Sequence, residues 1–139
     1  MERVSHYDKT FDKLDKSNSG TVDREFEKCT FINCNFTNTE FKNTVFADCT
    51  FVSCNLSNAK LKECQLNNVS FRDCKLVGVN FKVCTDFLFE VKFDNCILDY
   101  AGFSHKKMPG TPFNNCSAKF VDFSACDLSS AKFSNTDLS

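Results

Sequence analysis

Residues 26–61 read FEKCTFINCNFTNTEFKNTVFADCTFVSCNLSNAKL, and the spacing within this stretch decides how the chain folds. Every fifth residue is large and apolar: six phenylalanines from Phe26 to Phe51, then Leu56 and Leu61. Two places before each of these the residue is mostly Cys, Thr or Ala, and polar residues lie between. A period of five is neither the two of a strand nor the 3.6 of a helix. It indicates a repeat whose units bury little alone and must stack.

The repeat continues to the end of the chain, with one change of register. Its predicted core residues in the first run are Phe26, Phe31, Phe36, Phe41, Phe46, Phe51, Leu56, Leu61, Leu66, Phe71, Leu76 and Phe81. In the second run they are Leu88, Phe93, Leu98, Phe103, Phe113, Phe123, Leu128, Phe133 and Leu138, with Met108 and Ala118 as exceptions to the Phe and Leu rule. The second run is displaced by two residues, so an insertion must lie between Cys84 and Val91.

Several five-residue units resemble those of the pentapeptide-repeat family: a small residue, a polar one, Leu or Phe, and two more polar ones. The matching segments are FADCT (46–50), NLSNA (55–59), DLSSA (127–131) and KFSNTDLS (132–139). The resemblance covers residues 26–138 and implies an all-β fold, a right-handed, four-sided parallel β-helix with about twenty residues per coil. Cysteine spacing agrees, because five Cys pairs are twenty residues apart and only two are fifteen apart. We therefore expect about 5.6 coils.

The length of 139 residues fits a single domain. We expect the β-helix to occupy residues 25–139, and residues 1–24 to form an N-terminal cap or a partly disordered lead-in. Two segments break the pattern: the insertion at 85–90, and 104–112, where Pro109, Gly110 and Pro112 cluster and favour an outward loop. Because Leu88 and Met108 are twenty residues apart, four-sided stacking would place the two segments one above the other.

The chain has ten cysteines, and all of them fall at small-residue positions of the repeat, where Ala, Val and Thr alternate with them. A disulfide framework would be typical of a secreted protein, but free Cys also behaves as a small, buried apolar residue. We expect buried free thiols in a reducing compartment. Five of them would form one column: Cys34, Cys54, Cys74, Cys96 and Cys116.

The N-terminus is charged and lacks the apolar segment of a signal peptide, and no apolar run reaches the roughly 18 residues of a membrane helix. The expected location is the cytoplasm. No metal or other cofactor is predicted: CxxC spacing is absent, and His6 and His105 lie off the repeat positions. An EF-hand-like run from Asp15 to Asp23 has Phe26 where the bidentate Glu should stand.

No catalytic motif is present, so we expect a protein that is not an enzyme. Function should lie where the regular repeat is broken. The candidate interaction patch, with tolerated loop variation as the alternative, is Phe87, Phe89, His105, Lys106, Lys107 and Met108. The net charge of −1 gives neither a basic surface for nucleic acid nor a strong negative field.

The first functional hypothesis is a rigid scaffold for protein–protein interaction. The second comes from resemblance: FEKCTFINCNF (26–36) is similar to segments of the Qnr-type quinolone-resistance proteins, which imitate DNA and bind DNA gyrase or topoisomerase IV. An enzyme is the third and weakest. The chain stops directly after Leu138, so it is either a fragment or an open end that stacks on a partner. Members of the family dimerise through their C-terminal ends, which makes a homodimer the expected form of that stacking.

Overall fold

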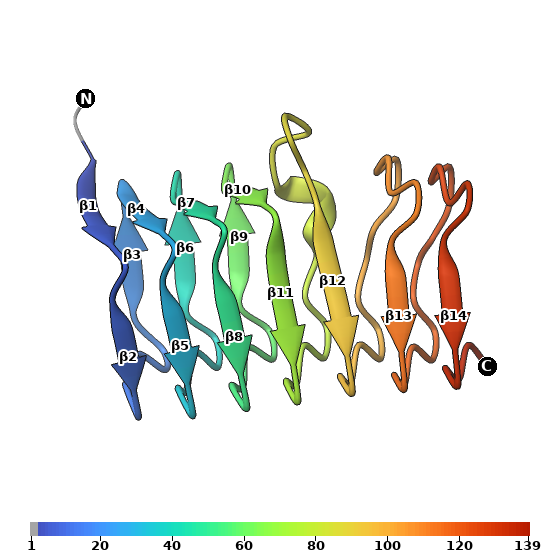
Figure 1. The fold of residues 1–139 in the computed structure, drawn as a ribbon, viewed down its shortest axis with the longest axis horizontal. Helices are drawn as coiled ribbons and strands as arrows, with labels where there is room; N and C mark the ends of the chain where they lie inside the picture. The colour runs from blue at the N-terminus through green and yellow to red at the C-terminus, as the bar shows by residue number, and fades with distance from the viewer. Residues whose placement is uncertain (1–2) are drawn as a thin grey trace.

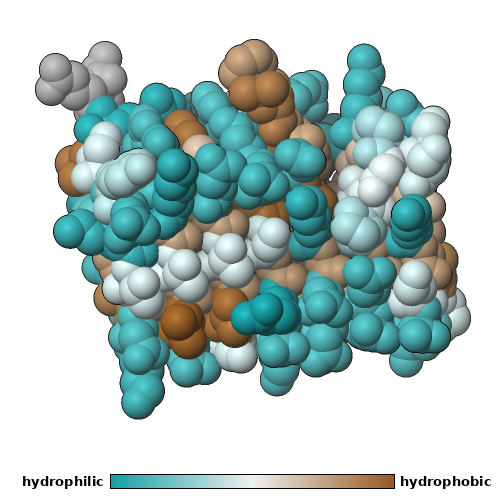
Figure 2. Space-filling model, viewed as in Figure 1, coloured by the Kyte–Doolittle hydropathy of each residue, from teal (hydrophilic) through white to brown (hydrophobic). Residues whose placement is uncertain are grey.

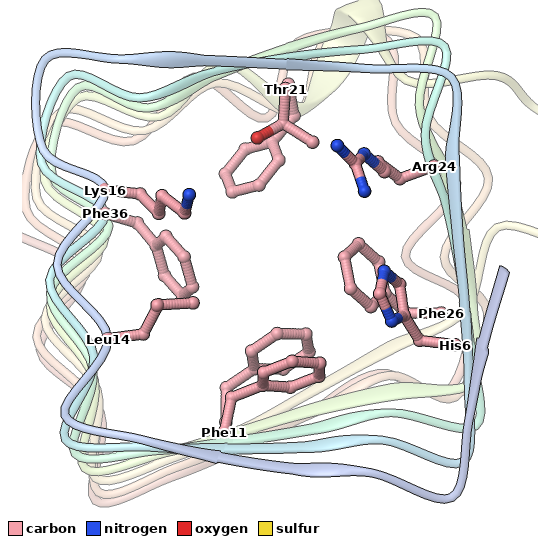
Figure 3. A pocket seen from close by; sticks show the side chains of 10 residues that line it. His6, Phe11, Leu14, Lys16, Thr21, Arg24, Phe26 and Phe36 are labelled. Carbon is pink, nitrogen blue, oxygen red and sulfur yellow. The ribbon is translucent and has the colours of Figure 1, made fainter. Parts of the chain in front are cut away.

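The computed structural model describes residues 3–139 as a parallel β-helix whose two ends lie at opposite ends of its long axis (Figure 1). Seen along the axis, the backbone traces a square (Figure 3). Over most of the chain each strand pairs with the strand twenty residues later, as Phe31 does with Phe51. The four-sided all-β fold expected from the repeat is therefore the fold of this chain. Within residues 3–139, no helix is long and apolar enough to cross a membrane.

The strands line up on three of the four faces. The first face holds β1 (Val4–Tyr7), β4 (Arg24–Glu27), β7 (Val45–Ala47) and β10 (Gln65–Asn67). The second face holds β2 (Thr10–Asp12), β5 (Thr30–Ile32), β8 (Thr50–Val52), β11 (Val69–Arg72), β12 (Val91–Asp94), β13 (Pro112–Asn114) and β14 (Lys132–Ser134). The third face is joined by isolated bridges such as Asn35↔Asn55. The fourth holds β3 (Gly20–Val22), β6 (Glu40–Lys42), β9 (Lys60–Lys62) and the 3-10 helix η1 (Phe81–Val83).

Stacked aromatic rings fill the inside of the coils. The predicted core residues of the first run, from Phe26 to Phe81, are all buried. Rings one coil apart lie nearly parallel: the centroids of Phe31 and Phe51 are 4.6 Å apart with an interplanar angle of 11°. In the second run Phe93 to Phe113 are buried, whereas Phe123, Leu128 and Phe133 in the last coil are only partly buried and Leu138 is exposed. Burial thus continues until the last coil, which lacks a neighbour within the described chain.

The corners of the coil share one backbone conformation. In regular coils, two residues after each core residue the backbone takes a positive φ, from Asp8 through to Asn135. Asn and Asp occupy most of these positions, as expected for residues that tolerate the left-handed region. Their side chains also bond from coil to coil, as when Asn43 Nδ2 donates to Asp23 Oδ1 at 2.7 Å.

The corner rule fails at Val83, the only β-branched residue at a corner position in either run of the repeat. Branching at Cβ makes a left-handed backbone costly. The chain forms η1 there instead, and the insertion follows at once. The first departure from the regular corner thus coincides with a residue that disfavours the left-handed backbone.

The structure differs from the sequence interpretation at the N-terminus, because β1, β2 and β3 pair with β4, β5 and β6 and form a complete coil. One strand per coil on the second face gives seven coils, so the expected 5.6 was too low. His6 was expected off the repeat positions, but it lies inside and stacks on Phe26. We missed this coil because three of its inward positions carry His6, Lys16 and Thr21 instead of Phe or Leu.

Segment 104–112 also differs from the expectation of an outward loop. Lys107 bridges Asp127, and the Met108 N–H donates to the Asp127 carbonyl at 2.8 Å. Gly110 takes the left-handed corner with φ of 74°. The two prolines flank this corner without disturbing the coil, so of the two segments expected to be irregular, 85–90 leaves the regular path and 104–112 follows it.

Candidate functional site

Residues 85–90, which we call the projecting loop, form the most prominent departure from the solenoid (Figure 1). Val69 of β11 pairs with Val91 of β12, a separation of twenty-two residues where regular coils have twenty. The two extra residues form a tight turn in which the Phe89 N–H donates to the Asp86 carbonyl at 3.3 Å. Leu88 at the turn has a φ of 56°. The loop stands on the first face, above β10, where no further strand continues the sheet in the described chain.

A buried lysine ties this loop to the next coil. Lys106 occupies a small-residue position, and only 1% of it is exposed. Its Nζ donates to the Cys84 carbonyl and, at 2.8 Å, to Asp86 Oδ1. The same Nζ lies 4.8 Å from the centroid of the Phe89 ring, a cation–π distance. A buried ammonium requires such acceptors, since an unpaired one is strongly unfavourable.

The electrostatics of the loop follow from this contact. The hydrogen bond from Lys106 and its positive charge lower the pKa of Asp86 below its ordinary value of 3.8. The Asp86 side chain remains largely exposed, so the ion pair is buried on the lysine side and hydrated on the other. The loop is therefore fixed at its base by Lys106 while its tip remains in contact with solvent.

The tip of the projecting loop is apolar. Phe87 and Leu88 are 68% and 62% exposed, among the highest values for large apolar residues of the described chain. Figure 2 shows the tip as a hydrophobic protrusion above a mainly hydrophilic surface. Leu88 was predicted as a core residue, and that prediction is wrong: the insertion turns it outward, and Phe89 packs against the core instead.

Two hollows flank the loop. One of about 310 Å³ is lined by Asp86, Phe87, Phe89, His105 and Lys107. The other, of about 560 Å³, lies on the Leu88 side and extends along β7 and β10. Asn67 Oδ1, in a residue lining this second hollow, is buried without a hydrogen-bond partner in the described chain. The arrangement can seat side chains of another macromolecule around an apolar protrusion.

The structure brings together only some of the residues proposed as an interaction patch. Phe87, His105 and Lys107 are exposed around the first hollow. Phe89 is half-buried, and Met108 is buried in the core at 2% exposure. Lys106 is also buried, and its ammonium contacts Asp86 and the Phe89 ring from inside the coil. The sequence does not separate the buried residues of this set from the exposed ones. A lysine at a small-residue position starts on the inner wall, but its sequence position does not tell where its ammonium group lies.

Sequence reasoning also missed two exposed rings away from the loop. Tyr100 and Phe120 are 64% and 69% exposed, and their rings stack with centroids 5.3 Å apart. Both residues occupy left-handed corners, with φ of 64° and 57°. The signal was available: aromatic residues twenty positions apart, where the repeat elsewhere has mostly Asn, Asp or Gly.

The cysteines line the inner wall. Cys34, Cys54, Cys74, Cys96 and Cys116 are buried, and the Sγ of Cys54 lies 3.3 Å from the Phe31 carbonyl that accepts its hydrogen bond. Burial raises the pKa of the Cys49 thiol to about 12 and that of Cys64 to about 11. Thiols with such pKa values are poor nucleophiles at neutral pH. Cys49 and Cys64 therefore act as packing groups in the inner wall.

Two segments match family models. Residues 24–85 match a model described as a pentapeptide repeat region, and residues 110–139 match one described as pentapeptide repeats. No curated protein matches the chain significantly.

The fold is also found in solved structures. One trypsin-treated variant of QnrB1, a plasmid-mediated fluoroquinolone resistance protein, superposes with a TM-score of 0.70 at 18% identity, covering 97% of this chain and 72% of that chain. A second trypsin-treated variant of QnrB1 gives 0.52 at 22% identity, covering 94% and 73%. At these identities the likeness shows the fold alone. Together the two family matches span about two thirds of the sequence, and the chain belongs to the pentapeptide-repeat family.

Proposed function

We propose that this chain is a non-enzymatic scaffold that binds a protein partner through the projecting loop. The observation that carries the proposal is the exposure of Phe87 and Leu88 on a loop whose base is tied down by Lys106. Exposed apolar tips are unfavourable in water unless a partner covers them, and such protrusions often mark interaction sites. A tied loop also loses little conformational entropy on binding, which favours affinity.

The surroundings of the loop suit a protein better than a nucleic acid. Asp86, His105 and Lys107 line the same hollow as Phe87 and Phe89, so acidic and basic side chains surround an apolar centre. This resembles the apolar core and polar rim of protein interfaces. With a net charge of −1, the chain also lacks the basic character that attracts a phosphate backbone.

We propose no catalytic role for the loop. None of the side-chain hydrogen bonds within residues 3–139 pairs His105 with a nucleophile, and the Lys106 ammonium is held by the Cys84 carbonyl and Asp86. Nine of the ten thiols are buried, Cys84 directly before the loop among them, and Cys126 is partly buried. The exposed apolar tip and the base held by Lys106 both suit binding, and catalysis would require neither.

A type II topoisomerase is the second candidate partner. QnrB1, a fluoroquinolone resistance protein, shares the fold, and in this chain a loop projects from the coil. Charge weakens the analogy, because a DNA mimic should carry a strongly negative field and this chain is nearly neutral. A topoisomerase contact would therefore depend on the loop more than on imitation of a DNA duplex.

A supercoiling assay with DNA gyrase, with and without a fluoroquinolone, tests the topoisomerase candidate. Recovery of supercoiling at protein concentrations near that of gyrase would support it. The double variant Phe87→Ala/Leu88→Ala should then lose the recovery, while Val22→Ala, an exposed apolar residue of β3, should keep it. If supercoiling does not recover even at high excess of the protein, a topoisomerase is not the partner. The scaffold proposal would then need a different one.

The scaffold proposal needs its own test. A photo-crosslinking amino acid at position 87 should give a discrete adduct in cells, and the same probe at position 22 should not. Equal labelling from both positions would contradict a role for the loop. This result does not depend on the identity of the partner.

We further propose a second copy of the chain as the cover for the last coil. Phe123, Leu128 and Phe133 are partly exposed there, whereas Phe103 and Phe113 in the coil before are fully buried. Light scattering should give the mass of a dimer for the wild type. Phe133→Lys should give a monomer, and a wild-type monomer at high concentration would contradict this proposal.

We propose the reducing cytoplasm as the location, a proposal supported by the burial of nine of the ten cysteines at packing positions of the coil. Mass measurement of the native protein should find ten free thiols. Thiol reagents should label few of them until denaturant is added, with the half-exposed Cys126 first. Two or more disulfides would contradict the proposed compartment.

A further inference from the structure

The fourth face of the coil carries a cluster of exposed lysines. In β6 and β9 the central residue of each strand is buried and the two residues flanking it are exposed. These outward residues include Lys42 of β6 and Lys60 and Lys62 of β9, and Lys82 follows on η1. We call these four residues the basic patch. Because the chain as a whole has a net charge of −1, the patch is a local concentration of positive charge.

The positive charges of the patch stand next to one another. Lys42 and Lys62 are register partners in neighbouring strands. Like charges directly opposite each other on neighbouring strands are destabilising. Glu40 is the register partner of Lys60, but neither of the ion pairs found within residues 3–139 includes a residue of the patch. The fold therefore carries a repulsion that a negatively charged partner would relieve.

A hollow opens beside these lysines where the sheet of the fourth face ends. β9 is the last strand of that sheet, because η1 takes the place of the next one. The hollow has a volume of about 340 Å³ and is lined by Lys60 and Lys62 on the β9 side and by Gly78, Asn80 and Val83 on the other. The Val83 side chain is exposed. A bound segment thus finds cations on one side and a small apolar surface on the other.

The basic patch adjoins the projecting loop. η1 ends at Val83 and the loop begins at residue 85, so Cys84 alone separates the two along the chain. Lys107, which lines the hollow beside Phe87, adds a further cation on the side of the loop. A protein bound at the tip of the loop can therefore reach the patch without crossing another face of the coil.

We infer that the basic patch binds an extended acidic segment of the partner that the projecting loop engages. This inference rests on the proposed scaffold function and adds the chemistry of the partner. Lys60 and Lys62 are two positions apart on one strand, where side chains of the same face are spaced by about 6.6 Å. An extended peptide has the same spacing between alternate residues. Carboxylates at every second position of the partner would therefore face both lysines.

A nucleic acid fits the patch less well. Sites for single-stranded nucleic acids combine cations with aromatic side chains on which the bases stack. None of the residues lining the hollow is aromatic. Glu40, beside Lys60, would also repel a continuous row of phosphates. A peptide can avoid this repulsion by placing a neutral residue there, so the observations favour an acidic protein segment.

Lysines at the end of a sheet have another common role, which makes the opposite prediction. They keep an edge strand from pairing with other chains. If Lys60 and Lys62 served only this purpose, an acidic peptide would show no saturable binding. Titration with such a peptide therefore separates the two roles.

The probe is a short fluorescein-labelled peptide in which Glu and Thr alternate, titrated into the full chain and followed by fluorescence anisotropy. We expect saturable binding that weakens as salt is added, because exposed charges are screened. The double variant Lys60→Gln/Lys62→Gln should bind the peptide about fivefold more weakly, since each exposed ion pair contributes modestly. The matched control, Lys92→Gln/Lys132→Gln, removes the same charge from exposed lysines of the second face and should bind like the wild type. Equal melting temperatures of the two variants separate loss of binding from loss of the fold.

Two further probes test the spacing and the class of the partner. A peptide with the same number of glutamates at every third position should bind about threefold more weakly, because its carboxylates alternate between faces. Equal affinity of the two peptides would contradict an extended segment. Tighter binding of an oligothymidylate of the same length would assign the patch to nucleic acid instead. Absence of saturable peptide binding, or equal losses in the two double variants, would overturn the inference.

The failure of this inference can be told apart from the failure of the scaffold proposal. Phe87→Ala/Leu88→Ala should bind the alternating peptide like the wild type, because the probe has no large apolar side chain for the tip. In cells, Lys60→Gln/Lys62→Gln should lower the yield of the adduct from the crosslinker at position 87. An undiminished yield would overturn the inference and leave the loop as a binding site. Peptide binding without any adduct at position 87 would instead overturn the role of the loop and support the acidic specificity of the patch.

Discussion

The regular coils between Phe26 and Phe81 and the coil interrupted by the projecting loop use one position of the repeat in opposite ways. Cys64 and Lys106 occupy the same column on the inner wall, and both are fully buried. The Cys64 thiol fills its place and donates to the Phe41 carbonyl at 3.3 Å. The Lys106 side chain instead reaches the first face and holds residues of the loop. A small residue closes a coil on its neighbour, whereas a long cation holds in place a segment that cannot follow the coil.

The two regions therefore differ in what stabilises them. Regular coils depend on rings stacked one above another, such as Phe51 between Phe31 and Phe71. The interrupted coil depends on a polar contact and leaves its apolar tip in water. Because aromatic stacking is spread over every coil and the lysine contact occurs once, substitutions should affect global stability in the first region and local order in the second.

The largest effect is expected in the regular coils. Phe51→Ala removes a buried ring with stacking partners on both sides, so the free energy of unfolding should fall by about 3–5 kcal/mol. Chemical denaturation monitored by circular dichroism measures it. Val22→Ala, on the outside of the first coil, should change the free energy by less than about 0.5 kcal/mol. A near-neutral Phe51→Ala would contradict the assignment of the ring stacks as the main source of stability.

An intermediate effect is expected from the lysine. Lys106→Met keeps the length of the side chain but leaves the buried Cys84 carbonyl without its donor, which should cost about 1–2 kcal/mol. The clearer consequence is local: chymotrypsin should cleave next to Phe87 and Phe89 several-fold faster than in the wild type. If cleavage rates are equal, Lys106 does not hold the loop.

Acid should reproduce part of this local change. The pKa of Asp86 is lowered in the folded protein, so the ion pair is present above the ordinary value of 3.8 and is lost as the pH falls through the lower folded value. Amide exchange at Phe89 should accelerate in that range. In the Asp86→Asn variant the Phe89 amide should exchange faster already at neutral pH, and its exchange should show no such transition. A wild-type loop with unchanged exchange down to a pH of about 2 would show that the carboxylate is not needed.

The smallest effect is expected at the exposed aromatic pair. Phe120→Asn replaces a ring at a left-handed corner with the residue that the repeat prefers there. It also removes the stacking with Tyr100, which is worth about 0.5–1.5 kcal/mol. The two contributions have opposite signs, so thermal unfolding should report a net change within about 1 kcal/mol. A larger loss would make the pair part of the framework that stabilises the regular coils.

Sequence reasoning succeeded where a rule repeats and failed where a single side chain departs from it. The position of the insertion followed from the change of register between Phe81 and Phe93. Large apolar residues do not reveal the first coil, because three of its inward positions carry His6, Lys16 and Thr21. The corner residues Asp8, Asn18 and Asp23 would have extended the repeat to the N-terminus, since they keep the five-residue spacing of left-handed positions.

The sequence by itself determined the period, the aromatic core and the position of the break, because each follows from residue types recurring at a fixed spacing. Only the tertiary structure decided which side of the projecting loop faces water, since an insertion has no period to follow and Leu88 and Phe89 are equally apolar. The tertiary structure also decided where the charged groups of the long cationic side chains lie. The Lys106 side chain reaches Asp86, twenty residues earlier, while that of Arg24 points toward the centre of the first coil (Figure 3). The reason is physical: spacing fixes where a side chain starts, whereas its contacts depend on what the neighbouring coils place within its reach.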